Sequence, residues 1–397
     1  MHWIENGMKQ TPPSDLRALG RQEVERARAF HRSIPSYQAT PLAELSGLSR
    51  TLGLGHIFVK DESHRFGINS FKGLGGAYAI GTYLARRLGL DIKDLTYETM
   101  ISPEIRRQLG EITFVSTTDG NHGRGVAWTA GKLGQKCVIF MPKGSSPERL
   151  ANIRALGAEA TITDLNYDDT IRMAAELAEK NGWVTIQDKD WEGYTDIPLW
   201  IMQGYAVMAL ECLEALDARG LRPTHIFVQA GVGSMAAAVT GFFADVYGPE
   251  LPSVVILESD QADCYCRTVG ANDGTLHLVG GEMDTIMAGL ACGEPTNLGW
   301  PILRDYARWF VSLQDSVTAT GMRILAAPVP GDPVVISGES GAVGLGLCYH
   351  LMSDDKYKDL RESLKLNADS TVLCFSTEGD TDKANYRKIV WEGAWAK

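Results

Sequence analysis

Apolar residues fall into two patterns that alternate along the chain. Short continuous runs, rich in Val, Ile and Phe, predict strands at residues 56–60, 112–117, 136–141, 158–163, 183–187, 225–229, 254–258 and 372–376. Longer segments, in which apolar residues recur at helical spacing, predict helices at residues 75–90, 126–133, 170–180 and 201–216. Strands that alternate with helices indicate parallel sheets, and continuous apolar strands are typical of sheets covered on both faces. The pattern therefore predicts an α/β fold.

Glycine is concentrated in the loops that follow three of the predicted strands. These loops begin after Thr117, Gln229 and Ser376. Their glycines are Gly120, Gly123, Gly125, Gly231, Gly233 and Gly379. In open α/β sheets, ligands bind outside the carboxyl ends of the strands. We therefore expect the functional site at these loops.

Lys72 stands in the segment N-S-F-K-G-L-G-G, residues 69–76, just before a predicted helix. A lysine that forms an imine needs a deprotonated amine and space for a planar cofactor. The flanking glycines Gly73, Gly75 and Gly76 predict that space. On this segment alone, a solvent-exposed lysine at a helix start is the competing interpretation.

A polar, glycine-rich turn, T-T-D-G-N-H-G-R-G at residues 117–125, joins a predicted strand to a predicted helix. Backbone N–H groups at such a helix start bind a carboxylate or a phosphate. The competing interpretation is a plain turn in which Asp119 or Asn121 caps the helix. The local chemistry leaves both interpretations open.

The segment Q-A-G-V-G-S-M-A, residues 229–236, follows a predicted strand and fits the pattern G-x-G-x-x-A. Glu258 ends the next strand, where a ribose-binding acid stands in dinucleotide folds. A dinucleotide-binding oxidoreductase is therefore one interpretation. The same geometry, with backbone amides around an anion at a helix start, serves a single phosphate equally well. The motif predicts phosphate binding and leaves the cofactor open.

Composition excludes several classes of partner. The chain has 397 residues, of which 44% are hydrophobic and 22% charged, as in a globular protein large enough for two domains. Its net charge of -11 and pI near 5.3, without a Lys/Arg run, argue against nucleic-acid binding. The N-terminus lacks a signal-peptide pattern, and no stretch reaches the roughly 18 apolar residues of a membrane span. We expect a cytoplasmic protein with no membrane partner.

The cysteines are seven in number and scattered along the chain, which fits reduced thiols in the cytosol. Cys264 and Cys266 form a C-x-C pair, but no second pair or His cluster completes a metal site, so we expect no metal. The sequence leaves open whether Cys264 and Cys292 pair with each other.

Four short motifs occur in an order that identifies a family. S-x-K ends at Lys72, G-N-H covers residues 120–122, a glycine loop covers 231–233, and E-S-G-A covers 339–342. In this order they resemble the fold-type II, tryptophan synthase β-like family of pyridoxal-phosphate enzymes, and the resemblance spans most of the chain. It implies pyridoxal 5'-phosphate as the cofactor.

The same resemblance implies an architecture. It consists of two α/β domains, each with a mostly parallel twisted sheet flanked by helices. The large, cofactor-binding domain is expected at residues 1–76 and 190–397, with a small α/β domain inserted at 77–189. The resemblance also implies a homodimer.

Each motif takes a role from this resemblance. Lys72 holds the cofactor as a Schiff base, and Asn121 contacts the ring hydroxyl. A hydroxyl residue faces the pyridine nitrogen, and register against the terminal loop favours Thr377 over Ser376. Glu339 also belongs to the implied cofactor-binding residues. The implied phosphate loop comprises Gly231, Val232, Gly233 and Ser234. The residues implied for substrate binding are Thr117, Thr118, Asp119, Gly120, Asn121, His122 and Asp188.

Three longer strings narrow the resemblance to the diaminopropionate ammonia-lyases within this family. They are T-D-G-N-H-G-R-G-V-A-W at residues 118–128, M-A-G-L-A-C-G-E-P at 287–295 and S-T-E-G-D-T-D at 376–382. This implies a carbon-nitrogen lyase that converts 2,3-diaminopropionate, as either enantiomer, to pyruvate and two molecules of ammonia by α,β-elimination. A threonine or serine dehydratase of the same fold and a non-catalytic pyridoxal-phosphate-binding protein are the alternatives.

Asp119 carries most of the distinction from the dehydratases. Those enzymes have a small neutral residue at this position, and a carboxylate there suits a substrate with an additional ammonium group. Asp188 resembles a second acid of the family's site, against the interpretation of an exposed loop aspartate. We expect Lys72, Asp119 and Asp188 to be catalytic, with Lys72 and Asp119 as bases on opposite faces of the substrate. Either Asp119 or Lys72 is expected to protonate the leaving amine.

Overall fold

The computed structural model describes residues 1–118 and 120–396, and the chain folds into two compact units. The large unit comprises Met1–Arg21, Thr40–His64 and Met208–Lys397, and the small unit comprises Gln22–Ala39 and Arg65–Val207. The small unit contains all of residues 77–189, the predicted small domain. It is larger than that prediction, since it also includes the start of α3 (Lys72–Arg87) and the first part of α9 (Asp196–Asp217). The sequence-based domain limits stay a prediction.

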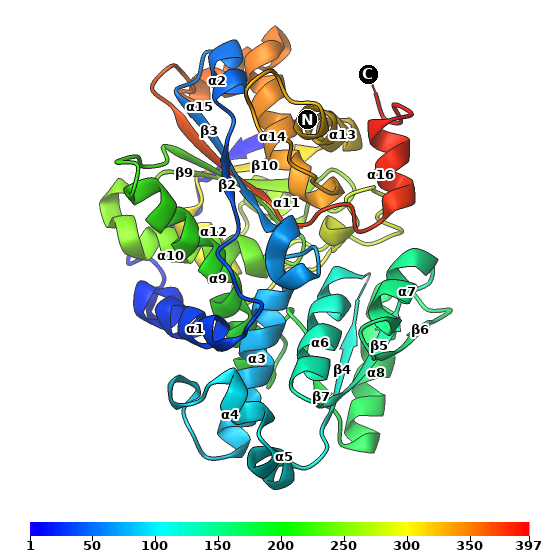
Figure 1. Cartoon of the computed structure of the whole chain (residues 1–397). Helices are drawn as coiled ribbons and strands as arrows, with labels where there is room; N and C mark the ends of the chain where they lie inside the picture. The colour runs from blue at the N-terminus through cyan, green and yellow to red at the C-terminus, as the bar shows by residue number, and fades with distance from the viewer. Residues whose placement is uncertain (119, 397) are drawn as a thin grey trace. The chain divides into compact units, whose positions relative to one another are not determined.

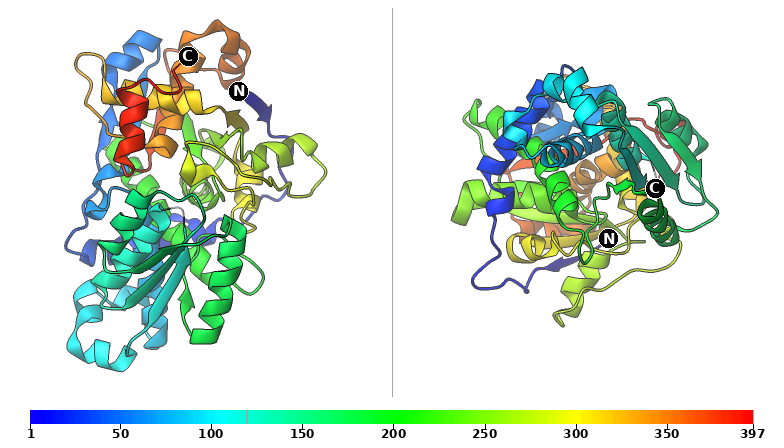
Figure 2. Two further views of the ribbon diagram at one scale, coloured as in Figure 1. Left: turned by 90° about the vertical axis from the view of Figure 1, so that its right-hand side faces the viewer. Right: turned by 90° about the horizontal axis from the view of Figure 1, so that it is seen from below.

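A four-stranded parallel sheet forms the centre of the small unit, in the order β6-β5-β4-β7. Its strands are β4 (Thr113–Thr117), β5 (Lys136–Met141), β6 (Glu159–Ile162) and β7 (Val184–Thr185). Its helices are α1 (Arg21–Ser33), α3, α4 (Tyr97–Ile101), α5 (Pro103–Leu109), α6 (Asn121–Lys132), α7 (Pro147–Arg154), α8 (Tyr167–Asn181) and the start of α9. Figure 2 shows α6 and α8 on opposite faces of this sheet. Right-handed crossovers explain this arrangement. From β4 to β6 the chain moves across the sheet in one direction, and after β6 it returns in the opposite direction to β7, so the later crossover helix, α8, lies on the other face from α6.

Glycines bring helices α3 and α6 into close contact. A Cβ atom on Gly125 would lie 2.6 Å from the carbonyl oxygen of Lys72, and one on Gly76 would lie 3.0 Å from the carbonyl oxygen of Gly125. A Cβ on Gly75 would overlap the ring of Tyr205. The expectation that these glycines leave space for a planar cofactor is therefore wrong for Gly75 and Gly76.

Gly73 needs the same correction, because a Cβ atom there would lie 2.8 Å from Cδ1 of Ile68. Protein atoms fill the space beside each of these glycines. The absent side chains of Gly76 and Gly125 allow the backbones of α3 and α6 to approach each other, which places the start of α3 against α6. Lys72 is the first residue of α3, so this packing positions it.

The large unit contains a seven-stranded sheet in the order β1-β10-β9-β8-β11-β3-β2. Its strands are β1 (His2–Glu5), β2 (Leu42–Glu44), β3 (His56–Asp61), β8 (His225–Gln229), β9 (Ser253–Ser259), β10 (Trp309–Leu313) and β11 (Thr371–Ser376). The five central strands are parallel, whereas the two edge strands, β1 and β2, run antiparallel to their neighbours. The prediction of mostly parallel sheets is confirmed.

Helices cover the large unit's sheet, and α14 packs against β8 and β11. Figure 1 shows α13 beside α14, with α16 close to both. The helices are α2 (Ser46–Leu52), α10 (Ser234–Tyr247), α11 (Cys264–Ala271), α12 (Trp300–Tyr306), α13 (Asp315–Ala326), α14 (Glu339–Ser353), α15 (Lys358–Leu364), α16 (Lys383–Val390) and the end of α9. Short 3₁₀ turns lie at Arg17–Leu19, Glu62–Gly67, Ile92–Asp94, Gly248–Glu250, Ala288–Leu290 and Asp355–Tyr357.

The apolar core of the large unit lies between this sheet and its helices. Val255, Val311 and Val372 of the strands and Leu345 of α14 are fully buried in it. Among the described residues, α9 is the one helix with the length and hydropathy of a membrane span, and 83% of its apolar window is buried inside the protein. Such burial is typical of a core helix.

Candidate active site

Lys72 lies at the start of α3 with its ammonium group held among three side chains of the small unit. Nζ forms an ion pair with the carboxylate of Asp188, and the side chain of Lys72 is 19% exposed. The same nitrogen lies 5.2 Å from the ring centres of Phe71 and Tyr205, at cation–π distance. Lys72 is therefore a partly buried, paired cation, and the interpretation as a solvent-exposed surface lysine is wrong.

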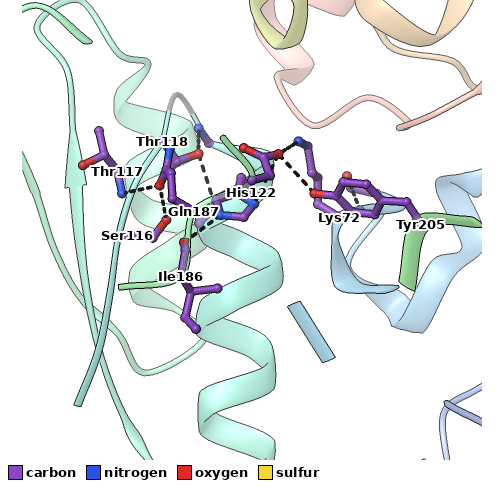
Figure 3. A network of polar contacts seen from close by, with 12 residues as sticks. Lys72, Ser116, Thr117, Thr118, His122, Ile186, Gln187 and Tyr205 are labelled. Carbon is purple, nitrogen blue, oxygen red and sulfur yellow. Dashed lines mark hydrogen bonds and ion pairs between the residues drawn. The ribbon is translucent and has the colours of Figure 1, made fainter. Parts of the chain in front are cut away.

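Asp188 is the centre of this cluster, and its side chain is 6% exposed. The hydroxyl of Tyr205 donates to its Oδ2 atom at 3.2 Å, and Nδ1 of His122 lies 3.7 Å from the same oxygen. Nε2 of His122 bonds to the carbonyl oxygen of Ile186 at 2.9 Å, as Figure 3 shows. Because a carbonyl can only accept, Nε2 carries the hydrogen. The exposed-loop interpretation of Asp188 is wrong.

The charges of the cluster support one another. Burial alone would lower the pKa of Lys72, but the charge of Asp188, the electrostatic effect of Tyr205 and hydrogen bonds to both residues together outweigh burial and raise this pKa above its ordinary value. Burial would raise the pKa of Asp188, but the charges of Lys72 and His122 and the hydrogen bonds from Lys72 and Tyr205 together outweigh burial and hold this pKa below its ordinary range. Burial also raises the pKa of Tyr205, so its hydroxyl stays neutral. Lys72 beside Asp188 is therefore an ammonium ion.

The loop between β4 and α6 is fastened to the segment that carries Asp188. Oγ of Ser116 donates to Oε1 of Gln187 at 3.0 Å, and the amide of Thr117 donates to the same oxygen at 3.3 Å (Figure 3). Gln187 directly precedes Asp188. These bonds fix the position of the carboxylate relative to the end of β4.

Thr118 organises the turn that follows. Its Oγ1 atom accepts hydrogen bonds from the amides of Gly120 at 2.9 Å and Gly123 at 3.1 Å. Two amides at the start of α6 are thereby satisfied, and His122 is held within the first turn of the helix. The structure thus brings most of the predicted substrate-binding residues of this turn together with Lys72 and Asp188. Asp119 lies outside the described residues.

Asn121 opens α6, and its side chain has a free acceptor. Its Oδ1 atom is buried and has no hydrogen-bond partner among the residues that the structure describes. Buried polar atoms are nearly always paired, so an unpaired one indicates a missing ligand group. A hydroxyl on a cofactor ring would satisfy it, which fits pyridoxal phosphate.

In the large unit, the glycine loop between β8 and α10 exposes a series of amide donors. The N–H groups of Gly231, Val232 and Gly233 have no acceptor within residues 1–118 and 120–396. The carbonyl oxygen of Val232 accepts from Oη of Tyr265 at 2.7 Å and from the amide of Thr296 at 2.8 Å. The C=O of Val232 and the N–H of Gly233 belong to the same trans peptide and point in opposite directions. The two bonds to this carbonyl therefore turn the Gly233 N–H away from Tyr265.

The conformation of this loop requires glycine. Gly233 has φ of 95°, in the left-handed region, and a Cβ there would overlap the hydroxyl of Tyr265. A Cβ on Gly231 would lie 2.7 Å from the carbonyl oxygen of Gly289. Three free amides ahead of α10, at the positive end of its dipole, could hold a phosphate. The residues present therefore fit the predicted cofactor.

The remaining predicted residues of the large unit lie around this loop. The amide of Gly289, in the string at 287–295, donates to Oγ of Ser340 at 3.2 Å. Glu339 begins α14, and its carboxylate accepts from Nδ2 of Asn385 at 2.6 Å. The E-S-G-A motif and the 287–295 string are thus part of one hydrogen-bonded region beside the glycine loop.

Thr377 has its hydrogen bonds inside the protein. Its Oγ1 donates to Oε2 of Glu378 at 2.6 Å and accepts from Nε2 of Gln229 at 3.1 Å. Oγ of Ser376 is buried and has no hydrogen-bond partner among the described residues. To face a ring nitrogen, Thr377 would have to redirect its single O–H. Ser376 has no hydrogen bond among the described residues to give up, but consecutive residues of an extended chain point to opposite faces of the sheet.

Glu258 has a structural task that argues against the dinucleotide interpretation. Its two carboxylate oxygens accept from the amides of Tyr265 at 2.9 Å and Cys266 at 2.7 Å. It is fully buried and caps the start of α11. A carboxylate engaged in this way is not presented to a ribose.

The cysteines carry no disulfide in this structure. Cys264 and Cys292 are both free thiols, as are the other five cysteines. In the part of the chain that the structure describes, no three His, Cys, Asp or Glu side chains gather in a way that could hold a metal ion.

Several residues that shape the two regions carry no motif. Tyr205 lies in the apolar helical pattern at 201–216, and this pattern predicts a core residue at its position. A buried tyrosine still needs a partner for its hydroxyl, which is the one signal that could have singled it out. Gln187 and Tyr265 likewise act through bonds between distant parts of the sequence.

Comparison with known proteins agrees with this geometry. Residues 34–377 match the model of the family described as pyridoxal-phosphate dependent enzyme. The chain is 52% identical to the diaminopropionate ammonia-lyase of Salmonella typhimurium over 367 residues, 92% of this chain and 91% of that protein.

Solved structures of the Escherichia coli diaminopropionate ammonia-lyase are similar over the whole chain. The complex with D-serine matches with a TM-score of 0.93 at 49% identity, covering 100% of this chain and 98% of that one. The complex with an aminoacrylate-PLP azomethine reaction intermediate matches with a TM-score of 0.91 at 48% identity and the same coverage. The predicted fold-type II class is confirmed, and the chain belongs to the pyridoxal-phosphate-dependent enzymes and, within them, to the diaminopropionate ammonia-lyase family.

Proposed function

We propose that the protein is a pyridoxal-phosphate-dependent carbon-nitrogen lyase that converts D- and L-2,3-diaminopropionate to pyruvate and two molecules of ammonia. The observation that carries this proposal is the Lys72–Asp188 pair, in a chain that matches diaminopropionate ammonia-lyases over 92% of its length. The fit of Asn121 and of the glycine loop to the cofactor supports it. The engagement of Glu258 in a helix cap weighs against an oxidoreductase.

When bound, pyridoxal phosphate supplies an aldehyde for a lysine amine and a ring that stores the electrons of a broken Cα–H bond. In this proposal Lys72 is the covalent anchor, and the amides of Gly231, Val232 and Gly233, with Ser234, hold the phosphate. Asn121 takes the ring hydroxyl. The proposed site also includes Glu339 near the cofactor and Thr377 at the ring nitrogen.

In this proposal the residues that transfer protons, or control their transfer, are Lys72, Asp119 and Asp188. In the free protein Lys72 carries a proton beside Asp188. Lys72 or Asp119 is proposed to keep the β-amine protonated as it departs, since an amine leaves poorly unless protonated. To act as a base, Lys72 must first lose this proton, and Asp188 opposes that loss. Asp119 is proposed as the base for the other enantiomer and as a contact for the substrate. Thr117, Thr118, Gly120 and His122 are proposed to line the substrate's position.

The stoichiometry of the products tests the proposal. 2,3-Diaminopropionate should give two ammonia per pyruvate, whereas serine gives one. We expect the purified protein with pyridoxal phosphate to turn over both enantiomers at the ratio of two, measured by coupled assays for pyruvate and ammonia. Preference for serine or threonine would establish a dehydratase instead. Cofactor binding without ammonia release would establish a binding protein.

We also propose that the enzyme works in the cytoplasm as a homodimer. Seven free thiols are compatible with a reducing compartment. Light scattering coupled to size-exclusion chromatography tests the assembly, and fractionation of the producing cells tests the location.

A further inference from the structure

The ammonium group of Lys72 occupies a site with the features of a cation-binding site. One side is the buried carboxylate of Asp188, and the others are the rings of Tyr205 and Phe71, each centred 5.2 Å from Nζ. A carboxylate combined with aromatic rings is a recognised way of binding ammonium groups. All four residues belong to the small unit.

We propose that Asp188 and Tyr205 form an ammonium-binding site that holds Lys72 in the free protein and takes the second ammonium group of the substrate once Lys72 has left. Tyr205 is thereby a residue that selects diamino acids over hydroxy amino acids. This inference rests on the proposed function, because it assigns a recognition site for the same substrate.

The first argument is electrostatic. Asp188 is almost fully buried, and the ammonium group of Lys72 is the cation in direct contact with it, while Nδ1 of His122 lies farther away, at 3.7 Å. Whenever the amine of Lys72 is used covalently, this ion pair is lost, and a buried carboxylate that loses its cation is strongly destabilised. 2,3-Diaminopropionate carries an ammonium group on its β-carbon, where serine and threonine carry a hydroxyl. The substrate that restores the lost charge is therefore a diamino acid.

The second argument concerns the orientation of Tyr205. Its hydroxyl donates to Oδ2 of Asp188, and its ring faces the cation. The ring is fully buried, packs 4.7 Å from the ring of Phe71 and fills the space beside Gly75. Tyr205 is therefore fixed before any ligand binds. A rigid wall costs little entropy on binding, which favours selective recognition.

The third argument is proximity. Lys72 reaches this site with its own side chain, and it is also the proposed anchor of the cofactor. The site is therefore within one lysine side chain of the reacting atoms. His122 completes it on the far side of Asp188, held by its bond to Ile186.

The variant Tyr205→Phe tests the inference, because it removes the bond to Asp188 and keeps the ring. A hydrogen bond to a charged group is worth about 10- to 100-fold in binding. We expect kcat/KM for 2,3-diaminopropionate to fall by that factor, mainly through KM, while kcat/KM for serine changes by less than about 3-fold. The matched control is Tyr78→Phe, a buried tyrosine of α3, which should leave both substrates unchanged. Equal losses on both substrates in Tyr205→Phe would overturn the inference.

A second measurement needs no turnover. In the protein stripped of cofactor, acetic anhydride labels unprotonated amines, and peptide mass spectrometry compares Lys72 with the other lysines. Tyr205→Phe and Asp188→Asn should both increase the labelling of Lys72, because each weakens the site that holds its ammonium form. Unchanged labelling in both variants would overturn the inference. Wild-type protein that releases no ammonia from 2,3-diaminopropionate would instead defeat the proposed function, and the labelling result would still stand.

Discussion

Lys72 and the glycine loop at residues 231–233 differ in how far the protein satisfies their polar groups. The ammonium of Lys72 has a carboxylate and two aromatic rings around it. The three loop amides have no acceptor among the described residues. Within its own unit, the Lys72 region has its charge satisfied, whereas the loop of the large unit presents donors that a ligand could use.

This difference indicates how ligand binding changes each region. If the loop binds a phosphate as proposed, it would gain hydrogen bonds and give up none of its own. The lysine region must first break the Lys72–Asp188 pair, so binding there exchanges one partner for another. Affinity should therefore come mainly from the loop, and selectivity and proton transfer mainly from the lysine region.

The variant Lys72→Ala separates the two regions most completely. It should abolish the covalent attachment of the cofactor and all measurable turnover, because no other residue is proposed to do this task. The loop amides remain, so pyridoxal phosphate should still bind without a covalent bond. Mass spectrometry after borohydride reduction measures the adduct, and equilibrium dialysis measures the remaining affinity. An adduct on another lysine would contradict the assignment.

The variant Asp119→Asn examines the acid that sequence alone identifies. Loss of a general base or acid costs about 10²- to 10⁴-fold in rate. We expect turnover of D-2,3-diaminopropionate to fall by this factor, and turnover of the L-enantiomer, whose proton goes to Lys72, to fall less. Steady-state ammonia release from each enantiomer measures the gap. Equal losses would mean that Asp119 binds the substrate and is not one of two bases.

The variant Gly233→Asp breaks the region that is open to an anion. It places a negative side chain where the phosphate is proposed to bind, at a residue with φ of 95°. Loss of one charged hydrogen bond corresponds to about a 10- to 100-fold higher Kd for pyridoxal phosphate. Gly248→Asp is the control, since Gly248 ends the same helix and also has positive φ. If Gly233→Asp bound the cofactor as tightly as the control, the loop would not be the phosphate site.

The variant Asp188→Asn removes the charge that completes the lysine region. The raised pKa of Lys72 stabilises the folded protein below about pH 10, and the lowered pKa of Asp188 does so above about pH 4. Between these limits, the cofactor-free variant should be about 1.5–3 kcal/mol less stable than the wild type. Denaturation by urea at several pH values measures this.

The matched control for that variant is Asp196→Asn, in the exposed Asp196–Arg86 pair of the same unit. Exposed pairs contribute about 0–1 kcal/mol. A loss in Asp188→Asn no larger than in this control would show that the Lys72 region is not held by its ion pair.

Sequence patterns predicted the elements that are determined locally. The structure has the predicted bounds for β5 and β8, because each contains a continuous apolar run. β8 is buried on both faces, whereas β5 is fully buried on one face only. The short edge strands β1 and β2 were not predicted, since their few residues pair with distant strands and carry no clear period. The run at β10 is as apolar as the predicted strands, although it is absent from the predicted set.

The candidate site residues also fall into a group that sequence predicts and a group that it does not. The predicted group lies in motifs that resemble the family, and it consists of Lys72, Asn121 and the glycine loop. The role of Gly75 was wrongly predicted, because its contact with Tyr205 joins residues far apart in the sequence. Tyr205 itself was missed for the same reason. What sequence alone could not provide is the set of contacts that only tertiary packing creates.

We expect the smallest effect from removing either of two neighbouring hydroxyl groups, those of Ser376 and Thr377. Thr377 is the predicted partner of the ring nitrogen, although its hydroxyl donates to Glu378 and accepts from Gln229. A neutral hydrogen bond is worth about 0.5–1.5 kcal/mol, so Thr377→Val should lower kcat/KM by about 2- to 10-fold and shift the absorbance of the bound cofactor. Ser376→Ala removes a hydroxyl that has no partner among the described residues and should change neither quantity. If Ser376→Ala shifts the spectrum and Thr377→Val does not, the ring nitrogen is bound by Ser376, and the open region extends from the loop amides to the end of β11.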